Sequence, residues 1–271
     1  LYFRFKIFKV ILLTNDDGIY APGLWALAQA LEDEEIIIVA PDREQSAVGT
    51  SITLHNPLRI KEIKNTPVPG IKTFSVEGTP ADSVILAIRY LARDKIRLVI
   101  SGINEGANLG NDVFISGTVG AALQGYFYNI PSIALSVGSY KNPRFDVASK
   151  FAKLMVRENL LPQGFLLNIN FPNLPLDEIE GVEITRLGVR SYMDEIKKGH
   201  DGKREYYWIV RGEPVWDEIP GTDIWAVRRK RISITPLRYS FDFENFELEE
   251  EFKEIFLRLK NEGGKGRDSR V

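Results

Sequence analysis

The sequence predicts an α/β fold in which a mostly parallel sheet lies between two layers of helices, giving three layers. Two observations support this fold class. Short runs of aliphatic residues alternate with segments whose apolar residues recur at helical spacing. Each aliphatic run is apolar throughout, which is typical of strands buried on both faces. With 271 residues, of which 44% are hydrophobic, the chain can form one large domain, or a domain plus an appendage.

The N-terminal segment predicts a strand, a helix and a second strand. Val10–Leu13 and Ile36–Val39 are the aliphatic runs that form the strands. Between them, apolar residues recur at helical spacing from Leu24 to Leu31, and Pro22 lies near the helix start, where proline is tolerated. We expect a right-handed connection between these parallel strands.

The next segment predicts a loop, an extended excursion and a helix. Residues 43–51 are mostly small and polar and leave the second strand as a loop. Residues 52–76 predict a hairpin-like excursion interrupted by prolines and glycine. A Thr-Pro-Ala-Asp sequence at Thr79–Asp82 then begins a helix that continues to about Arg93.

Strands and helices continue to alternate as far as Asn170. We expect strands at 98–100, 132–136 and 165–170, and helices at 119–126 and 145–157. Residues 101–112, rich in glycine and asparagine, predict a loop with tight backbone approaches. This loop does not match the G-x-G-x-x-G pattern, so the sequence does not support a dinucleotide fingerprint.

The alternation stops after residue 171, where we place a domain boundary. The pattern of residues 172–238 predicts mostly extended structure, with strands at Tyr206–Val210 and Ile232–Thr235, followed by an amphipathic helix. We expect residues 172–262 to form a C-terminal extension of β-hairpin and helix that mediates oligomerisation, and residues 263–271 to be a disordered tail. The basic cluster Arg228–Arg231 favours a solvated strand edge over nucleic-acid binding. The apolar positions of the helix are Leu248, Phe252, Ile255, Phe256 and Leu259.

Composition excludes several classes of function. A formal net charge of -2 gives no global attraction to DNA or to a membrane surface. The absence of cysteine excludes disulfides and Cys-based zinc sites, and two histidines make a multi-histidine metal site improbable. Residues 1–9 lack the features of a signal peptide, and we expect a cytoplasmic protein.

Oxygen-bearing side chains follow the predicted strands at one edge of the sheet. Asp16 and Asp17 come after the first strand, Ser46 after the second and Asn104 after the strand at 98–100. Ligands of open α/β sheets bind beyond the carboxyl ends of the strands. These four donors suit Mg²⁺, Mn²⁺ or Ca²⁺, with waters or substrate oxygens completing the coordination. The alternative for the acidic pair is capping of the following helix.

Hydroxyl and backbone donors lie near the same edge. Ser116, Gly117 and Thr118 precede a helix and could cradle a phosphate, although plain helix capping is the alternative. Residues 49–51 could line the pocket. His55 could act as a general acid or be a structural histidine.

Five motifs follow one another along the chain: Thr14–Gly18, Ala40–Arg43 with Ser46-Ala47, Gly78–Asp82, Ser101–Gly106 and Ser116–Val119. Together and in this order they resemble the SurE family, the survival-protein-E nucleotidases. The resemblance implies a Rossmann-like core, dimers or tetramers built through the C-terminal extension, and a cytoplasmic location. It also implies a phosphomonoesterase that hydrolyses nucleoside 5′- and 3′-monophosphates with one Mg²⁺ or Mn²⁺ per subunit. By that match the metal ligands are Asp16, Asp17, Ser46 and Asn104. Ser233–Pro236 also resembles a later segment of the family.

Two other functions compete with this hypothesis. A phospho-acceptor signalling module also places an acidic pair after its first strand, but it needs an aspartate after the third strand, where this chain has Ser101 and Asn104. A non-catalytic nucleotide- or RNA-binding protein would use the basic cluster and the aromatic residues Tyr206–Trp208.

Overall fold

A computed structural model describes residues 9–93, 95–160, 164–192, 194–210, 212, 214–238 and 253. The chain divides into two compact units, residues 1–237 and 238–271, and the description below concerns the first. The C-terminal helix predicted from 248 to 259, apart from residue 253, and the predicted tail lie outside the described residues.

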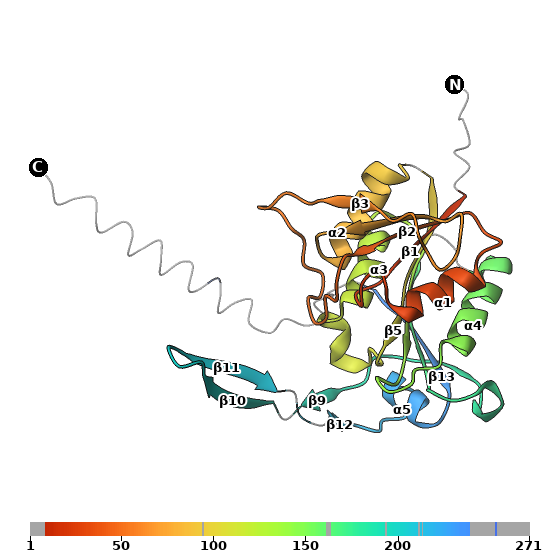
Figure 1. Cartoon of the computed structure of the whole chain (residues 1–271). Coiled ribbons are helices and arrows are strands. Elements are labelled where there is room, and N and C mark those ends of the chain that lie inside the picture. The colour runs from red at the N-terminus through yellow and green to blue at the C-terminus, as the bar shows by residue number, and fades with distance from the viewer. Residues whose placement is uncertain are drawn as a thin grey trace, which may run out of the picture. The chain divides into compact units, whose positions relative to one another are not determined.

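A nine-stranded sheet forms the centre of the first unit, in the order β3-β4-β2-β1-β5-β6-β7-β13-β8 (Figure 1). The six strands from β4 to β7 run parallel to their neighbours. At the edges, β3 and β13 pair antiparallel, with β4 and β7 respectively, and β8 runs parallel to β13. The α/β prediction is therefore confirmed. The parallel strands are β1 (Val10–Thr14), β2 (Ile36–Pro41), β4 (Lys72–Val76), β5 (Ile96–Glu105), β6 (Ser132–Val137) and β7 (Leu166–Phe171), and the edge strands are β3 (Ile60–Glu62), β8 (Val182–Ile184) and β13 (Ile232–Pro236).

Helices cover both faces of the sheet. On one face α1 (Pro22–Ala30) packs with α4 (Phe145–Arg157), and on the other α2 (Pro80–Leu86) packs with α3 (Gly117–Phe127). Alternate residues of β1 face opposite layers, so Ile11 and Leu13 lie in the first core, and Val10 and Leu12 lie in the second. Burial on both faces explains why the parallel strands are apolar throughout.

The predicted helix at 80–93 and the predicted loop at 101–112 both differ in detail from the structure. A π-helical turn, η1 (Ala87–Leu91), follows α2 directly. Strand β5 continues to Glu105, with a register shift between Ser101 and Asn104, where the sequence predicted a loop. Gly102 has φ 132°, and a Cβ there would lie 2.4 Å from the Leu135 carbonyl oxygen. The glycine therefore lets an irregular strand stay paired with β6.

The region after residue 171 contains both sheet strands and separate ribbons. Strands β8 and β13 lie in the main sheet, so the predicted boundary at 171/172 falls between strands of one sheet. Two further pairs form their own ribbons: β10 (Glu195–His200) with β11 (Glu205–Val210), and β9 (Arg190–Tyr192) with β12 (Pro214–Trp216). The described residues also form two short 3₁₀ turns, η2 (Gly110–Phe114) and η3 (Leu176–Glu178).

A short helix that the sequence analysis missed, α5 (Asp223–Arg228), precedes β13. The basic cluster at 228–231 begins at the end of this helix, so its predicted place along a strand edge was wrong. The Thr222 side chain accepts a hydrogen bond from the Trp225 backbone and caps the helix. Six residues are too few to show a helical period in the sequence.

No helix within the described ranges combines the length and apolarity needed to cross a bilayer.

Candidate functional site

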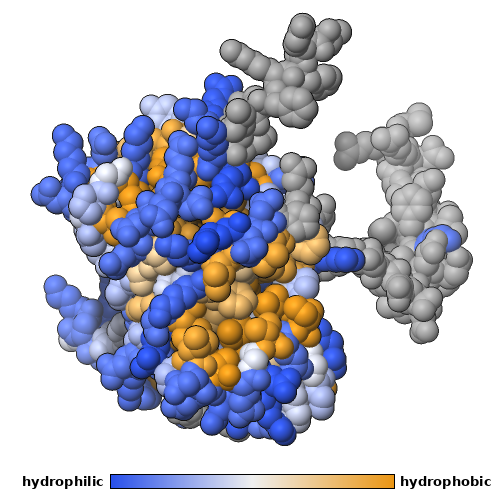
Figure 2. Space-filling model, turned by 90° about the vertical axis from the view of Figure 1, so that its right-hand side faces the viewer, coloured by the Kyte–Doolittle hydropathy of each residue, from blue (hydrophilic) through white to orange (hydrophobic). Residues whose placement is uncertain are grey.

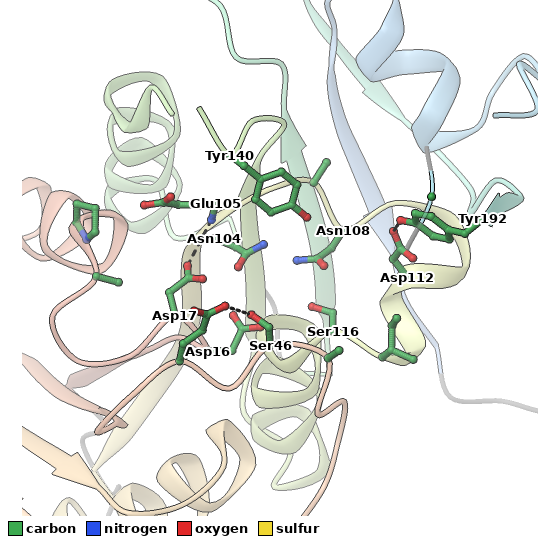
Figure 3. A pocket seen from close by; sticks show the side chains of 17 residues that line it. Asp16, Asp17, Ser46, Asn104, Glu105, Asn108, Asp112, Ser116, Tyr140 and Tyr192 are labelled. Carbon is green, nitrogen blue, oxygen red and sulfur yellow. Dashed lines mark hydrogen bonds between the residues drawn. The ribbon is translucent and has the colours of Figure 1, made fainter. Parts of the chain in front are cut away.

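A cavity of about 590 Å³ opens at the carboxyl edge of the parallel strands (Figure 3). Asp16 and Asp17 reach it from the end of β1, Ser46 from the loop after β2, and Asn104 from the last part of β5. Ser116, which caps α3, also lines it. The four predicted metal ligands thus share one cavity, although 88 positions of sequence separate Asp16 from Asn104.

Asp16 is buried and held in place from α3. The Thr118 hydroxyl donates a hydrogen bond to an Asp16 carboxylate oxygen. A Cβ at Gly117 would lie 2.7 Å from Asp16 Cβ, so only glycine leaves room for this approach. Burial raises the pKa of Asp16 above its usual value of 3.8, and the hydrogen bond from Thr118 opposes that rise.

Asp17 is partly buried within an acidic environment. Burial, followed by the charge of Asp16, raises the pKa of Asp17 from 3.8 to about 7. The Glu105 backbone N–H donates to Asp17 Oδ2 at 3.3 Å and opposes the rise. The carboxylates of Glu105 and Glu44 add further negative charge. A cation bound between these groups would remove the repulsion that keeps the pKa of Asp17 high.

Ser46 and Asn104 supply the neutral oxygen atoms. The Ser46 hydroxyl donates to Glu44 Oε1 at 2.6 Å. Asn104 is buried, and its side-chain amide nitrogen donates to the Gly106 carbonyl at 2.7 Å. That bond fixes the orientation of the amide, so its oxygen can serve as an acceptor or ligand in the cavity.

The chemistry of the cavity lining fits an oxygen-ligated divalent cation. Its described lining residues include five carboxylates and no lysine, arginine or histidine. An anionic substrate could not bind among these carboxylates without a compensating positive charge. Carboxylate, hydroxyl and amide oxygens are the ligands that Mg²⁺ and Mn²⁺ accept. The described residues contain no cluster of three or more His, Cys, Asp or Glu side chains suited to a metal, so a site here depends on mixed donors.

The three residues predicted to cradle a phosphate differ in position: one lines the cavity, and the other two contact Asp16. Ser116 lines the cavity, and its hydroxyl oxygen accepts from the Val119 backbone N–H as a helix cap. Thr118 is fully buried and does not line the cavity, because its hydroxyl bonds to Asp16. Gly117 provides the space beside Asp16.

Residues 49–51 and His55 do not line the cavity. The Gly49 backbone instead packs against α3, because a Cβ at Gly120 would lie 2.3 Å from the Gly49 carbonyl oxygen. His55 is exposed.

A buried network of polar side chains behind the cavity was missed in the sequence analysis. The Asn108 side chain donates to Ser136 Oγ at 2.9 Å, and its backbone carbonyl accepts from the amides of Asn168 and Asn170. Asn108 Nδ2 also lies 3.4 Å from Thr118 Oγ1, which links the network to Asp16. The only signal was that these polar residues follow or interrupt buried strands.

Other lining residues were missed as well: Glu44, Glu105, Tyr140 and Tyr192. Glu44, Glu105 and Tyr140 follow strands at the same edge or end them, so the rule that found Asp16 could have found them. Tyr192 comes from the β9–β12 ribbon, and its hydroxyl donates to Asp112 Oδ2 at 2.6 Å.

Known proteins share both the sequence and the fold. The family model described as survival protein SurE matches residues 11–194. A protein named 5′-nucleotidase SurE from Carboxydothermus hydrogenoformans is 49% identical over 254 residues, which cover 90% of this chain and 94% of that protein. The protein of the same name from Dehalococcoides mccartyi (strain CBDB1) is 46% identical over 235 residues, which cover 84% and 88% respectively.

A solved structure, the crystal structure of SurE protein from Aquifex aeolicus, has a TM-score of 0.74 and 39% sequence identity. The match covers 91% of this chain and 99% of that one. The family model spans the acidic pair, the residues around Asn104 and the start of α3, which are the segments that build the cavity. The resemblance found in the motifs is therefore confirmed, and the chain belongs to the SurE family.

Proposed function

We propose that the protein is a divalent-metal-dependent phosphomonoesterase that hydrolyses nucleoside 5′- and 3′-monophosphates to nucleoside and phosphate. The observation that carries the proposal is the cavity in which Asp16 and Asp17 face a hydroxyl and an amide oxygen without a described basic residue. Relatives at 44–49% identity that bear the name 5′-nucleotidase SurE support it.

Asp16, Asp17, Ser46 and Asn104 would hold one Mg²⁺ or Mn²⁺ per subunit. Such an ion supplies positive charge that polarises a phosphoryl oxygen and makes a water molecule more acidic. Proton transfer and orientation of the phosphate are carried out by side chains of the protein. We assign proton acceptance from the attacking water to Asp17, because it is less buried than Asp16 and does not bond to Thr118.

The overall reaction breaks the bond between phosphorus and the ester oxygen. Water oxygen bonds to phosphorus as the bond from phosphorus to the ester oxygen breaks, and one proton of the attacking water goes to Asp17. The ester oxygen takes a proton from solvent water and leaves as the nucleoside hydroxyl, and Asp17 then returns its proton to solvent. Ser46 and Asn104 orient the phosphate, and Ser116 offers a further hydroxyl group from the cavity wall. Precise placement of this kind is the main protein contribution to phosphoryl transfer.

A competing route goes through an aspartyl-phosphate on Asp16 or Asp17. Thr118 and burial limit the access of a substrate phosphorus to Asp16, which disfavours an aspartyl-phosphate on that residue and leaves Asp17 as the candidate for this route. Rapid-quench trapping of a covalent phosphoenzyme during turnover would overturn the direct route.

The deciding experiment measures phosphate release from a panel of nucleoside 5′- and 3′-monophosphates, with and without Mg²⁺ or Mn²⁺. We expect metal-dependent release, and a loss on the order of 100-fold or more for Asp17→Asn. Asp33→Asn is the matched control, because Asp33 is an exposed aspartate that pairs with Lys153 and does not line the cavity. Absence of release from every nucleotide, with RNA binding retained, would favour a non-catalytic RNA-binding protein instead.

We also propose that the protein forms homodimers or homotetramers through the region after residue 171. The β10–β11 ribbon pairs with no other described strand, and a two-stranded ribbon is marginally stable alone. Its exposed apolar side chains need a partner surface. Figure 2 shows that hydrophobic side chains also gather on another face, the one on the right of Figure 1. The exposed residues of the ribbon include Ile196, Tyr207, Trp208 and Ile209.

A further inference from the structure

An aromatic ring at the rim of the cavity has no role in the chemistry proposed above. Tyr140 lies in the loop after β6, lines the cavity and is 76% exposed. Figure 3 shows its ring on the other side of the opening from Asp16, Ser46 and Ser116. The other tyrosine of the cavity, Tyr192, differs because its hydroxyl is bonded to Asp112 and it is only partly exposed.

The Tyr140 ring packs against Gly106. A Cβ at Gly106 would lie 2.3 to 2.5 Å from the outer atoms of the ring, so the ring packs directly on a glycine backbone. Gly106 has φ 102°, and its carbonyl accepts the hydrogen bond that orients Asn104. The ring therefore lies beside the proposed metal-ligand set, with its tip against Gly106, while most of the residue remains exposed.

The loop that carries the ring is also anchored. The Ser139 hydroxyl donates to the Lys141 carbonyl at 2.7 Å and accepts from the Lys141 backbone N–H at 3.1 Å. The Gly138 backbone N–H donates to the Phe171 carbonyl at 2.9 Å, which ties the loop to β7. A fixed aromatic side chain loses little conformational entropy when a ligand stacks on it.

We propose that Tyr140 stacks on the nucleobase of the substrate and so makes the enzyme prefer nucleotides to other phosphate esters. The proposal rests on the proposed function and deepens it by naming what is recognised beyond the phosphate. A phosphate bound near Asp16 and Asp17 leaves the rest of the cavity to the sugar and base. An open aromatic ring at the rim matches the flat face that every nucleobase presents.

Stacking of this kind also predicts broad base tolerance. Each base has a π-face, so stacking discriminates weakly among bases. We therefore expect purine and pyrimidine monophosphates to depend on Tyr140 in the same direction, with purines affected more because their rings are larger.

The test compares adenosine 5′-monophosphate with ribose 5-phosphate, which has the same phosphate and sugar but no base. Tyr140→Ala should raise KM for adenosine 5′-monophosphate about 10-fold with kcat nearly unchanged. Its affinity for ribose 5-phosphate, measured as KM or as the inhibition constant against nucleotide hydrolysis, should stay within about 2-fold of wild type. Tyr140→Phe, which keeps the ring, should restore the KM of wild type.

Tyr90→Ala is the matched control, because Tyr90 is 73% exposed in η1 and does not line the cavity. An unchanged KM for the nucleotide in Tyr140→Ala, or an equal loss for both ligands, would overturn the stacking proposal. If the wild-type protein releases phosphate from no nucleotide, the proposed function fails, and this proposal fails with it. Wild-type activity with an unaffected Tyr140→Ala variant would leave the enzymatic function in place and reject stacking alone.

Discussion

At the scale of single residues, the site depends on how Asp16 is held. Its carboxylate is buried and accepts a hydrogen bond from Thr118, and Thr118 lies next to the buried asparagine network. Partners of this kind fix the direction in which a ligating carboxylate points. We therefore expect Thr118 to position Asp16, whereas its place in the sequence predicted direct contact with phosphate.

Replacing Thr118 with valine removes the hydroxyl and keeps the shape of the side chain. We expect Thr118→Val to weaken Mn²⁺ binding about 10- to 100-fold, because Asp16 loses the donor that orients it. Isothermal titration of the metal-free protein with Mn²⁺ measures this change, and Thr118→Ser should retain most of the affinity. Equal Mn²⁺ affinity in the valine variant and the wild type would show that the hydrogen bond from Thr118 does not orient Asp16 for metal binding.

The raised pKa of Asp17 predicts how stability depends on pH. Because the pKa is 3.8 ordinarily and about 7 in the folded protein, the folded state binds more protons than the unfolded state between these values. The contribution of Asp17 to the free energy of unfolding of the metal-free protein should therefore fall as pH rises from about 4 to about 7.

Metal binding should show the opposite trend, because the ion requires ionised carboxylates. We expect Mn²⁺ to raise Tm more at pH 8 than at pH 5, as thermal unfolding at both pH values can measure. Asp17→Asn should lose both the fall in stability assigned to Asp17 and most of the Mn²⁺ effect. A Tm increase with Mn²⁺ that is as large at pH 5 as at pH 8 would contradict this linkage.

At the scale of elements, the start of α2 fastens the loop that follows Ser46. Asp82 accepts hydrogen bonds from the Thr53 backbone N–H at 2.9 Å, from the Thr53 hydroxyl at 2.6 Å and from the Thr79 backbone N–H at 2.9 Å. Thr79 in turn caps α2 and donates its hydroxyl to the Ser51 carbonyl at 2.7 Å. The Thr-Pro-Ala-Asp motif therefore caps α2 and also binds the preceding loop to the helix through hydrogen bonds.

Removing the Asp82 carboxylate should break the hydrogen bonds that join this loop to the start of α2. We expect Asp82→Ala to lower the free energy of unfolding by about 2–4 kcal/mol, because the capping box is lost and the partly buried donors of Thr53 and Thr79 lose their acceptor. Urea denaturation measures the loss. Glu77→Gln is the control, since the pair of Glu77 with Arg59 is exposed and should contribute little. A loss no larger than that of the control would mean that other contacts hold the loop.

At the scale of the whole molecule, the described part of the chain combines an α/β core, covered by helices on both faces of its sheet, with two separate two-stranded ribbons. The core uses helices on both faces of its parallel strands, so those strands are covered. Among the described strands, β10 and β11 pair only with each other, and their ribbon exposes aromatic and aliphatic side chains. This contrast is the basis of the proposed subunit contact.

A charge placed on the ribbon should weaken association of subunits. We expect Ile209→Lys to shift the protein toward smaller species at equal concentration, because a charged side chain is costly in an apolar interface. Light scattering over a range of concentrations measures the species present, and Tyr20→Lys, an exposed position outside the ribbon, is the control. A single monomeric mass for the wild type at every concentration would contradict the proposed oligomer.

The sequence by itself determined the family, through its motifs, together with five of the six parallel strands and the four oxygen donors that follow them, because a strand buried on both faces is a continuous apolar run. The sixth parallel strand, β4, was predicted only as part of the extended excursion at 52–76. Only the tertiary structure decided that Thr118 turns toward Asp16, that Tyr140 stands at the rim of the cavity, and that β8 and β13 extend the main sheet. The physical reason is distance along the chain. The Thr118–Asp16 bond joins residues 102 positions apart, and no local pattern of hydrophobicity or turn residues records such a contact.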